Sequence, residues 1–207
     1  MATAPFTLFA IAAPGLEPVV AKELTQLGEQ PRAEEGGVSW AGVVRSLMRA
    51  NLWLRSATRV IARVAEFRAT AFHELEKQAK RVDWGAWLDA GVEPEFKVTA
   101  KKSKLYHSDA IAGHLLVACG AGPGRNPDHK PGPISHKQLF IVRVHRDVFT
   151  ISADTSGELL HMRGYRQAVA KAPLRETLAA AMLLANHRTG DASLLEPMCG
   201  LGTSPID

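Results

Sequence analysis

The sequence predicts an α+β protein: a ferredoxin-like N-terminal unit, a second α+β unit, and the opening of a nucleotide-binding α/β domain. Three observations predict this class. The first 65 residues carry apolar patterns in the order strand, helix, strand, strand, helix, strand. A hairpin pattern follows over residues 139–153. Near residue 195 a buried strand pattern runs into a Gly-x-Gly turn, where glycine lets a backbone approach a ligand closely.

The first unit is placed at residues 1–65. Helical spacing of apolar residues predicts two helices, and alternation predicts the strands on either side of them. Gly36-Gly37 predicts a hairpin turn. The expected elements are a strand over Thr7–Ala12, a helix over Leu16–Leu27, paired strands over Arg32–Glu34 and Val38–Trp40, a helix over Val43–Leu52 and a strand over Thr58–Ala65.

The second unit is placed at residues 66–156. Its apolar anchor is expected at Trp84, and Ser108 or Asp109 is expected to cap its second helix. A long loop dense in Gly and Pro covers Gly120–Lys137. The expected elements are a helix over His73–Arg81, a strand over Glu95–Ala100, a helix over Ala110–Ala118 and a hairpin of Leu139–Val144 with Val148–Ala153 around Arg146-Asp147.

Residues 157–207 read as a linker and the start of a Rossmann-like domain. A helix over Pro173–Asn186, with Pro at its start, precedes a buried strand over Ser193–Pro197. Gly200-Leu201-Gly202 follows that strand, and by spacing alone it is either a nucleotide-binding loop or a chance occurrence. A phosphate-binding P-loop is excluded because no Lys follows the second glycine.

Composition sets the class of partner. The chain of 207 residues has only two cysteines, which excludes a disulfide framework and favours a reducing, cytoplasmic setting. No apolar run is long enough to span a membrane, and His129 and His136 lack acid or Cys partners at metal-binding spacing, so neither a membrane nor a metal is expected. Residues 45–81 hold nine Lys or Arg against three Glu, a net charge of +6, which predicts a footprint for a polyanion.

Two groups of cations are the candidate phosphate contacts. Arg55, Arg59 and Arg63 are expected on one exposed strand face, and Lys101, Lys102 and Lys104 lie in a loop after a strand. The alternative for the lysines is a solvated loop without a partner. Tyr106 follows them and would either stack on a base or, as the commoner role, be buried.

The C-terminal motif resembles a known enzyme family. The stretch Leu194–Thr203, read Leu-Leu-Glu-Pro-Met-Cys-Gly-Leu-Gly-Thr, resembles the first cofactor motif of the large-subunit ribosomal RNA guanine-N2 methyltransferases and their tRNA relatives. Residues 160–166 resemble the linker of that family and residues 172–181 its pre-motif helix. Residues 66–156 resemble its RNA-binding THUMP domain, supported by residues 105–110.

The resemblance implies S-adenosyl-L-methionine as cofactor and structured RNA, of the ribosomal kind, as partner. The residues it implies for the cofactor are Glu196, Cys199, Gly200, Gly202, Thr203, Pro173 and Thr177. Glu196 stands where the family has Asp, and Leu201 where it has Ser. For Pro173 and Thr177 the alternative is a plain helix start and core packing.

No catalytic residue is assigned, because the family's Asn-Pro-Pro-Tyr motif does not occur in this sequence. The chain is expected to stop just after the first cofactor motif, to bind the cofactor weakly or not at all, and to self-associate through apolar C-terminal residues. The function expected is RNA binding within an S-adenosylmethionine-dependent guanine-N2 methyltransferase. The alternatives are a stand-alone, non-catalytic RNA-binding THUMP protein and part of a DNA methyltransferase.

Overall fold

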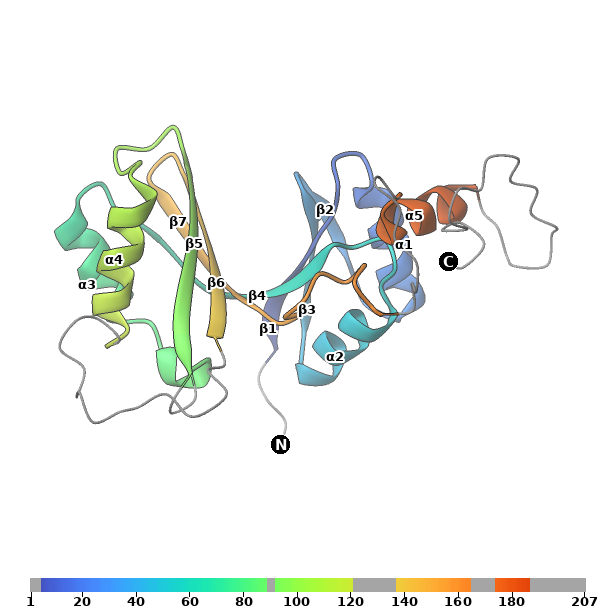
Figure 1. Ribbon diagram of the computed structural model, residues 1–207, viewed down its shortest axis with the longest axis horizontal. Helices are drawn as coiled ribbons and strands as arrows, with labels where there is room; N and C mark the ends of the chain where they lie inside the picture. Colours follow the sequence, from blue (N-terminus) through green and yellow to red (C-terminus); the bar gives the residue numbers. More distant parts are fainter. Residues whose placement is uncertain (1–4, 89–91, 121–136, 165–173, 187–207) are drawn as a thin grey trace. The chain divides into compact units, whose positions relative to one another are not determined.

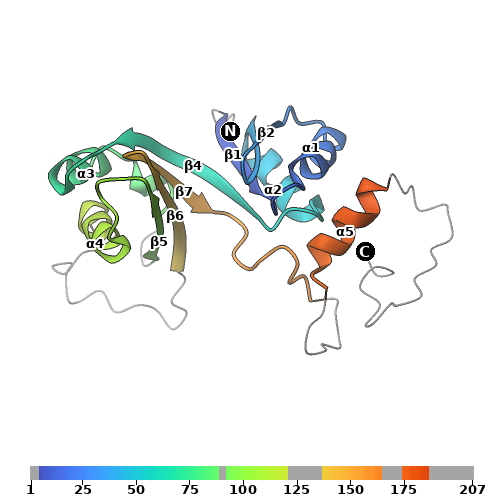
Figure 2. The same cartoon turned by 90° about the horizontal axis from the view of Figure 1, so that it is seen from above.

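A computed structural model describes residues 5–88, 92–120, 137–164 and 174–186 (Figures 1 and 2). The chain divides into two compact units: unit 1 contains Met1–Ile61 and Thr155–Asp207, and unit 2 contains Ala62–Asp154. Unit 2 is thus inserted into the sequence of unit 1. The expected strand over Ser193–Pro197 and most of the loop over Gly120–Lys137 lie outside the described residues.

Unit 1 has the predicted ferredoxin-like arrangement. Its strands follow the order β2-β3-β1-β4, and β1 pairs antiparallel with β3. The strand β4 begins in unit 1 and continues into unit 2. The elements are β1 (Phe6–Ile11), α1 (Glu17–Gln26), β2 (Arg32–Glu34), β3 (Gly37–Gly42), α2 (Val44–Trp53), β4 (Arg59–Arg68) and α5 (Glu176–Ala185).

The hairpin between β2 and β3 depends on its glycines. Gly36 has a φ of +80°, a left-handed conformation that glycine adopts without strain. A Cβ on Gly37 would lie 2.2 Å from the carbonyl oxygen of Ala10, so only glycine lets β3 approach β1 this closely. Leu8 and Ala10 of β1 are fully buried, which places the middle of the core at this strand.

Unit 2 is a sheet with two helices packed on it. The strand order is β4-β7-β6-β5, with β6 antiparallel to β7 and parallel to β5. Figures 1 and 2 show α3 and α4 side by side on the same side of this sheet. The elements are α3 (Phe72–Ala79), a short 3-10 helix (Trp84–Ala86), β5 (Glu93–Lys101), α4 (Ser108–Ala118), β6 (Lys137–His145) and β7 (Val148–Asp154).

Aromatic rings close one end of the unit 2 core. Trp84 meets Phe96 and Phe140 edge-on, with ring centroids 5.7 and 5.3 Å away, and its Nε1 donates to the Ala79 carbonyl at 2.9 Å. Edge-to-face aromatic contacts stabilise a core beyond the area that they bury. The apolar anchor predicted at Trp84 is therefore part of this core.

The structure corrects three details of the sequence prediction. Helix α5 begins at Glu176, with Arg175 as its N-cap, rather than at Pro173. Helix α4 is preceded by His107 in an extended conformation, and neither Ser108 nor Asp109 caps it. Strand β4 ends at Arg68, beyond the end predicted at Ala65. The domain limits derived from sequence stay a prediction.

No helix in the described ranges has the length and apolar character needed to cross a membrane. Within the same ranges, no group of three His, Cys, Asp or Glu residues could hold a metal ion. His129 and His136 lie outside the described residues.

Candidate nucleic-acid interface

Three segments of unit 2 meet at one end of its sheet. The loop after β5, the turn between β6 and β7, and the residue after β4 are joined by backbone hydrogen bonds. Arg146 N donates to the Lys101 carbonyl at 3.3 Å, and Ala69 N donates to the Asp147 carbonyl at 3.0 Å. Because β5 and β6 are parallel, their carboxyl ends lie at the same edge, which brings the loop to the turn.

Asp147 organises this edge. Arg146 and Asp147 both have positive φ, 51° and 64°, as the two-residue hairpin turn favoured by strand twist requires. The Asp147 carboxylate accepts a hydrogen bond from Lys104 N at 2.8 Å, and Asp147 N donates to Ser103 Oγ at 2.6 Å. The hydrogen bond from the Lys104 backbone holds the pKa of Asp147 below its usual value, helped by Ser103 and by the charges of Arg68 and Lys104. Asp147 is therefore an ionised acceptor for the loop backbone.

The three segments that meet at Asp147 carry exposed cationic side chains. We call them the basic tip, which consists of Arg68, Lys101, Lys102, Lys104 and Arg146. Next to it Tyr106 is 66% exposed, with its ring centroid 4.1 Å from that of His107. The buried role expected for Tyr106 is wrong, and an exposed aromatic beside several cations is an arrangement that suits nucleic acid.

The three arginines predicted on one strand face are arranged differently. Arg55 precedes β4, in the bend after α2, so only Arg59 and Arg63 lie on the strand. Both are half-buried rather than exposed. Arg59 donates to the Gly157 carbonyl at 2.7 Å, and Arg63 lies 3.5 Å from Ser152 Oγ. The exposed basic strand is thus not observed, and RNA contact by these three residues stays a prediction.

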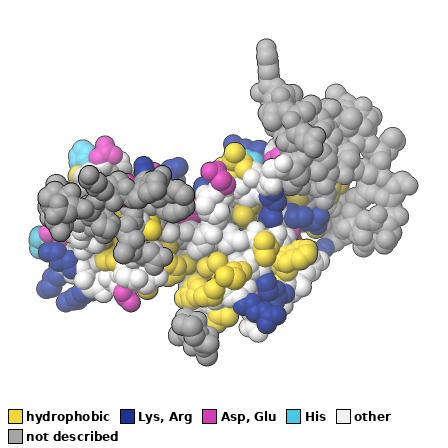
Figure 3. Space-filling view, turned by 60° about the horizontal axis from the view of Figure 1, so that its bottom comes forward, with side chains coloured by type: hydrophobic (Ala, Val, Ile, Leu, Met, Phe, Trp, Pro, Cys, Tyr) yellow, Lys and Arg dark blue, Asp and Glu magenta, His cyan; other side chains and the backbone are white. Residues whose placement is uncertain are grey.

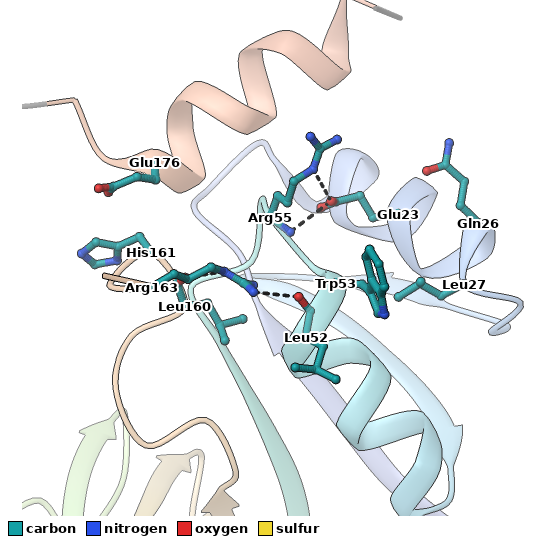
Figure 4. A pocket seen from close by; sticks show the side chains of 10 residues that line it. All are labelled: Glu23, Gln26, Leu27, Leu52, Trp53, Arg55, Leu160, His161, Arg163 and Glu176. Carbon is teal, nitrogen blue, oxygen red and sulfur yellow. Dashed lines mark hydrogen bonds and ion pairs between the residues drawn. The ribbon is translucent and has the colours of Figure 1, made fainter. Parts of the chain in front are cut away.

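The family-like linker motif is fixed to unit 1 by Arg163 (Figure 4). Its guanidinium donates to the carbonyls of Leu52 at 2.7 Å, Leu54 at 2.6 Å and Asn51 at 3.3 Å, and its Nε to that of Leu160 at 3.0 Å. The last carbonyls of a helix lack partners within the helix. Arg163 therefore caps the C-terminus of α2 and ties the linker to it.

A second charged group has a similar structural role. Glu23 of α1 is 7% exposed and accepts hydrogen bonds from the backbone N of Arg55 at 3.1 Å and of Ser56 at 3.0 Å, and from the Ser56 hydroxyl. The Arg55 Nε lies 3.9 Å from the same carboxylate. Glu23 thereby joins α1 to the bend between α2 and β4.

Of the residues predicted to hold the cofactor, the structure describes Thr177 alone. It lies in the first turn of α5 and is 5% exposed, which agrees with the core-packing alternative for this residue. The others lie outside the described residues: Pro173, Glu196, Cys199, Gly200, Gly202 and Thr203.

Comparisons with known proteins match both ends of the chain. The family model described as "RlmL ferredoxin-like domain" matches residues 7–61, and "RMKL-like, methyltransferase domain" matches residues 163–207. The Synechocystis protein slr0064, which carries an RNA methyltransferase name, is 35% identical over 94% of this chain and 52% of its own length. The ribosomal RNA large subunit methyltransferase K/L of Methylococcus capsulatus is 33% identical over 96% of this chain and 28% of its own length.

The chain is therefore similar to the K/L-type RNA methyltransferase family over nearly its whole length. It spans about half the length of the slr0064 relative. A Listeria monocytogenes structure, titled a predicted N6-adenine-specific DNA methylase, superposes with a TM-score of 0.87 at 36% identity, over 98% of this chain and 54% of that one. The methyltransferase-like protein SMU.472, solved as a complex with SAH, superposes with a TM-score of 0.87 at 33% identity. The match covers 99% of this chain and 55% of that one. Unit 2 is the THUMP-like sheet of this K/L-type family.

Sequence reasoning missed several residues of this K/L-type chain. Arg68 and Arg146 were not assigned to the lysine loop, because their proximity depends on the parallel pairing of β5 with β6. In the sequence, Arg163 is only part of a motif, and nothing near it indicates its carbonyl partners. The place of Arg146 and Asp147 between two predicted strands does indicate a tight turn with positive φ. The sequence does not give the direction of the neighbouring strand, so it cannot predict that this turn lies beside the lysine loop.

Proposed function

We propose that this chain binds structured RNA of the ribosomal large subunit for S-adenosylmethionine-dependent methylation at guanine N2, in the cytoplasm. The basic tip of unit 2 is the proposed contact surface. The observation that carries the proposal is the convergence of five exposed cations from three segments around one carboxylate that is already engaged by the backbone.

The physical argument rests on phosphate recognition. Lysine and arginine side chains that meet phosphates release condensed counterions, so affinity falls steeply as salt rises. Asp147 fixes the backbone from which Lys104 projects, so the cations start from a defined position. Tyr106, exposed beside them, offers a ring on which an unpaired base can stack.

The cofactor assignment is supported by the methyltransferase model over residues 163–207 and by the SAH complex of SMU.472. S-adenosylmethionine supplies an electrophilic methyl group for attack by the exocyclic amine of the base. In this chain Glu196, Gly200 and Gly202 are the proposed lining of the cofactor, with Cys199, Thr203, Pro173 and Thr177 as further candidates, and binding by the 207 residues alone is proposed to be weak.

A salt series tests the RNA surface. Filter binding of ribosomal RNA hairpins should give a slope of log affinity against log salt that flattens by about two to three units when Lys101, Lys102 and Lys104 become Ala. The matched control is Lys77→Ala, Lys80→Ala and Arg81→Ala, which removes the same charge from exposed positions on or next to α3. An equal effect in both triple variants would show that RNA responds only to the net charge of the chain, and that the basic tip is not a specific contact surface.

Two added arms separate the alternatives. A DNA duplex of matched sequence tests the alternative of DNA binding, which the name of the Listeria protein suggests, and RNA is expected to bind more tightly. A radiolabelled methyl-transfer assay on the same hairpins separates binding from catalysis. RNA binding without transfer is expected for the 207 residues, and turnover above background would contradict the weak cofactor site.

A further inference from the structure

Unit 1 contains a pocket of about 520 Å³ at the C-terminal ends of α1 and α2 (Figure 4). The volume lies within the range of roughly 300–1,000 Å³ that is usual for sites of small ligands. Leucines and Trp53 supply the apolar surface. The polar lining holds cations, an imidazole, an amide and two carboxylates: Arg55, Arg163, His161, Gln26, Glu23 and Glu176. The pocket is separate from the basic tip, which belongs to unit 2.

The walls of this pocket are held in place. Glu23 binds the backbone of the Arg55–Ser56 bend, and Arg163 binds the carbonyls at the end of α2. Both charged groups thus hold the backbone that carries the Trp53 and Arg55 side chains. A site with rigid walls loses less conformational freedom when a ligand binds.

Two side chains of the pocket project from these walls. The Trp53 side chain belongs to a residue that is 66% exposed, although large aromatic residues are usually well buried. The Arg55 side chain is 48% exposed, and its Nε lies 3.9 Å from the Glu23 carboxylate. His161 adds a buried Nδ1 that has no hydrogen-bond partner in the part of the chain that the structure describes. Such an unsatisfied buried atom is uncommon.

The surroundings favour a polyanion with aromatic groups. Helix α2 carries no Asp or Glu, and Arg45 and Arg49 run one turn apart toward Trp53. Figure 3 shows hydrophobic side chains gathered over α2 beside Lys and Arg side chains. An exposed indole flanked by arginines suits stacking of a base with contact to its phosphate.

The geometry points to this pocket as a binding site for one unpaired nucleotide of RNA, with its base stacked on Trp53 and its phosphate against Arg55. The inference rests on the proposed function, since it assigns RNA a second contact surface in unit 1. The shared chemistry is a nucleobase with a phosphate, and a free nucleotide would present the same groups.

The test uses the whole 207-residue chain and an eight-nucleotide unstructured RNA at low salt. Of the four tryptophans, Trp40 and Trp84 are 3% and 8% exposed, and Trp87 is partly buried against the core of unit 2. Trp53 is 66% exposed, so quenching should come chiefly from Trp53. Trp53→Phe should remove most of that quenching but keep affinity, measured by anisotropy of a labelled oligonucleotide, within about threefold. Trp53→Ala should weaken binding about ten- to a hundredfold, the loss expected for one stacked base.

Met48→Ala is the matched control, because Met48 is 57% exposed on the same helix and does not line the pocket. It should leave the affinity for the oligonucleotide unchanged. An equal loss in both alanine variants, or tighter binding of an acidic amphipathic peptide than of RNA, would overturn the inference and assign the helix face to a protein. Guanosine monophosphate as competitor distinguishes a nucleotide within RNA from a free nucleotide. If it displaced the RNA with an affinity equal to that of the RNA itself, the assignment of the pocket to RNA would be overturned.

The triple lysine variant of the basic tip separates this inference from the proposed function. It should weaken hairpin binding and flatten its salt dependence, yet keep the quenching of Trp53 by the short oligonucleotide. If Trp53→Ala instead bound the oligonucleotide as the unchanged chain does, while hairpin binding stayed intact, the pocket inference would fail and the proposed function would stand.

Discussion

Charged side chains act differently in the two units. In unit 1, Glu23, Arg59 and Arg163 bond mainly to backbone groups and hold segments together. In unit 2, the lysines of the basic tip are exposed, and a single carboxylate, Asp147, organises the backbone beneath them. Charge density along the sequence is therefore a poor guide to a binding surface, because a planar guanidinium near carbonyl groups is readily used as a structural clamp.

The largest effect expected from this contrast is on stability in unit 1. Glu23→Ala leaves the buried Ser56, which is 1% exposed, without its acceptor. The free energy of unfolding should fall by roughly 3 kcal/mol, since hydrogen bonds to a charged group are lost and buried donors stay unpaired. Urea denaturation followed by circular dichroism measures it. Glu35→Ala removes the same charge at an exposed position and should change little.

Removal of the Arg163 clamp should have the next largest effect. Arg163→Ala deprives three carbonyls at the end of α2 of a donor, which should lower the free energy of unfolding by about 1–2 kcal/mol. Arg163→Lys should recover less than half of the lost free energy, because a single ammonium group cannot donate to several carbonyls as the planar guanidinium does. If the lysine variant were as stable as the unchanged chain, charge alone would account for the clamp.

Smaller effects are expected for the arginines once predicted to form a basic strand. Arg55→Ala should flatten the salt slope of RNA binding by about one unit if Arg55 meets a phosphate. Arg59→Ala should flatten it less, because the Arg59 guanidinium is bonded to the Gly157 carbonyl. Filter binding over the same salt range ranks the two. The reverse order would show that RNA competes successfully for Arg59.

The smallest effect is a pH dependence at the basic tip. The folded pKa of Asp147 is lowered, so its stabilising contribution is present above the unfolded pKa of about 3.9 and is lost as the pH falls through the lower folded value. Asp147→Asn keeps an oxygen acceptor and tolerates the positive φ, yet should remove this dependence. The Lys104 amide chemical shift, followed by NMR below pH 5, should titrate in the unchanged chain and stay constant in the variant.

The sequence predicts the elements of this fold better than the contacts between them. Local alternation and helical spacing place β1, α1 and the β6–β7 hairpin correctly. The start of α5 was misplaced because Pro173 suggested a first helical turn that begins only at Glu176.

The site was less accessible to sequence reasoning. The lysine loop was found from its charge, whereas the Arg146 and Arg68 contributions follow from strand pairing across the sheet of unit 2. The partners of Arg59 and Arg163 are backbone carbonyls about a hundred residues away along the chain, and no local pattern signals such partners.

The insertion of unit 2 into unit 1 has a consequence for folding order. Unit 1 is closed by bonds such as Thr155 N to the Val60 carbonyl and Leu160 N to the Thr58 carbonyl. During synthesis from the N-terminus, every residue of Ala62–Asp154 emerges before these bonds can form. Early folding of the intervening segment shortens the effective loop and lowers the entropy of closing it. This insertion thereby makes the closing of unit 1 easier once unit 2 has folded.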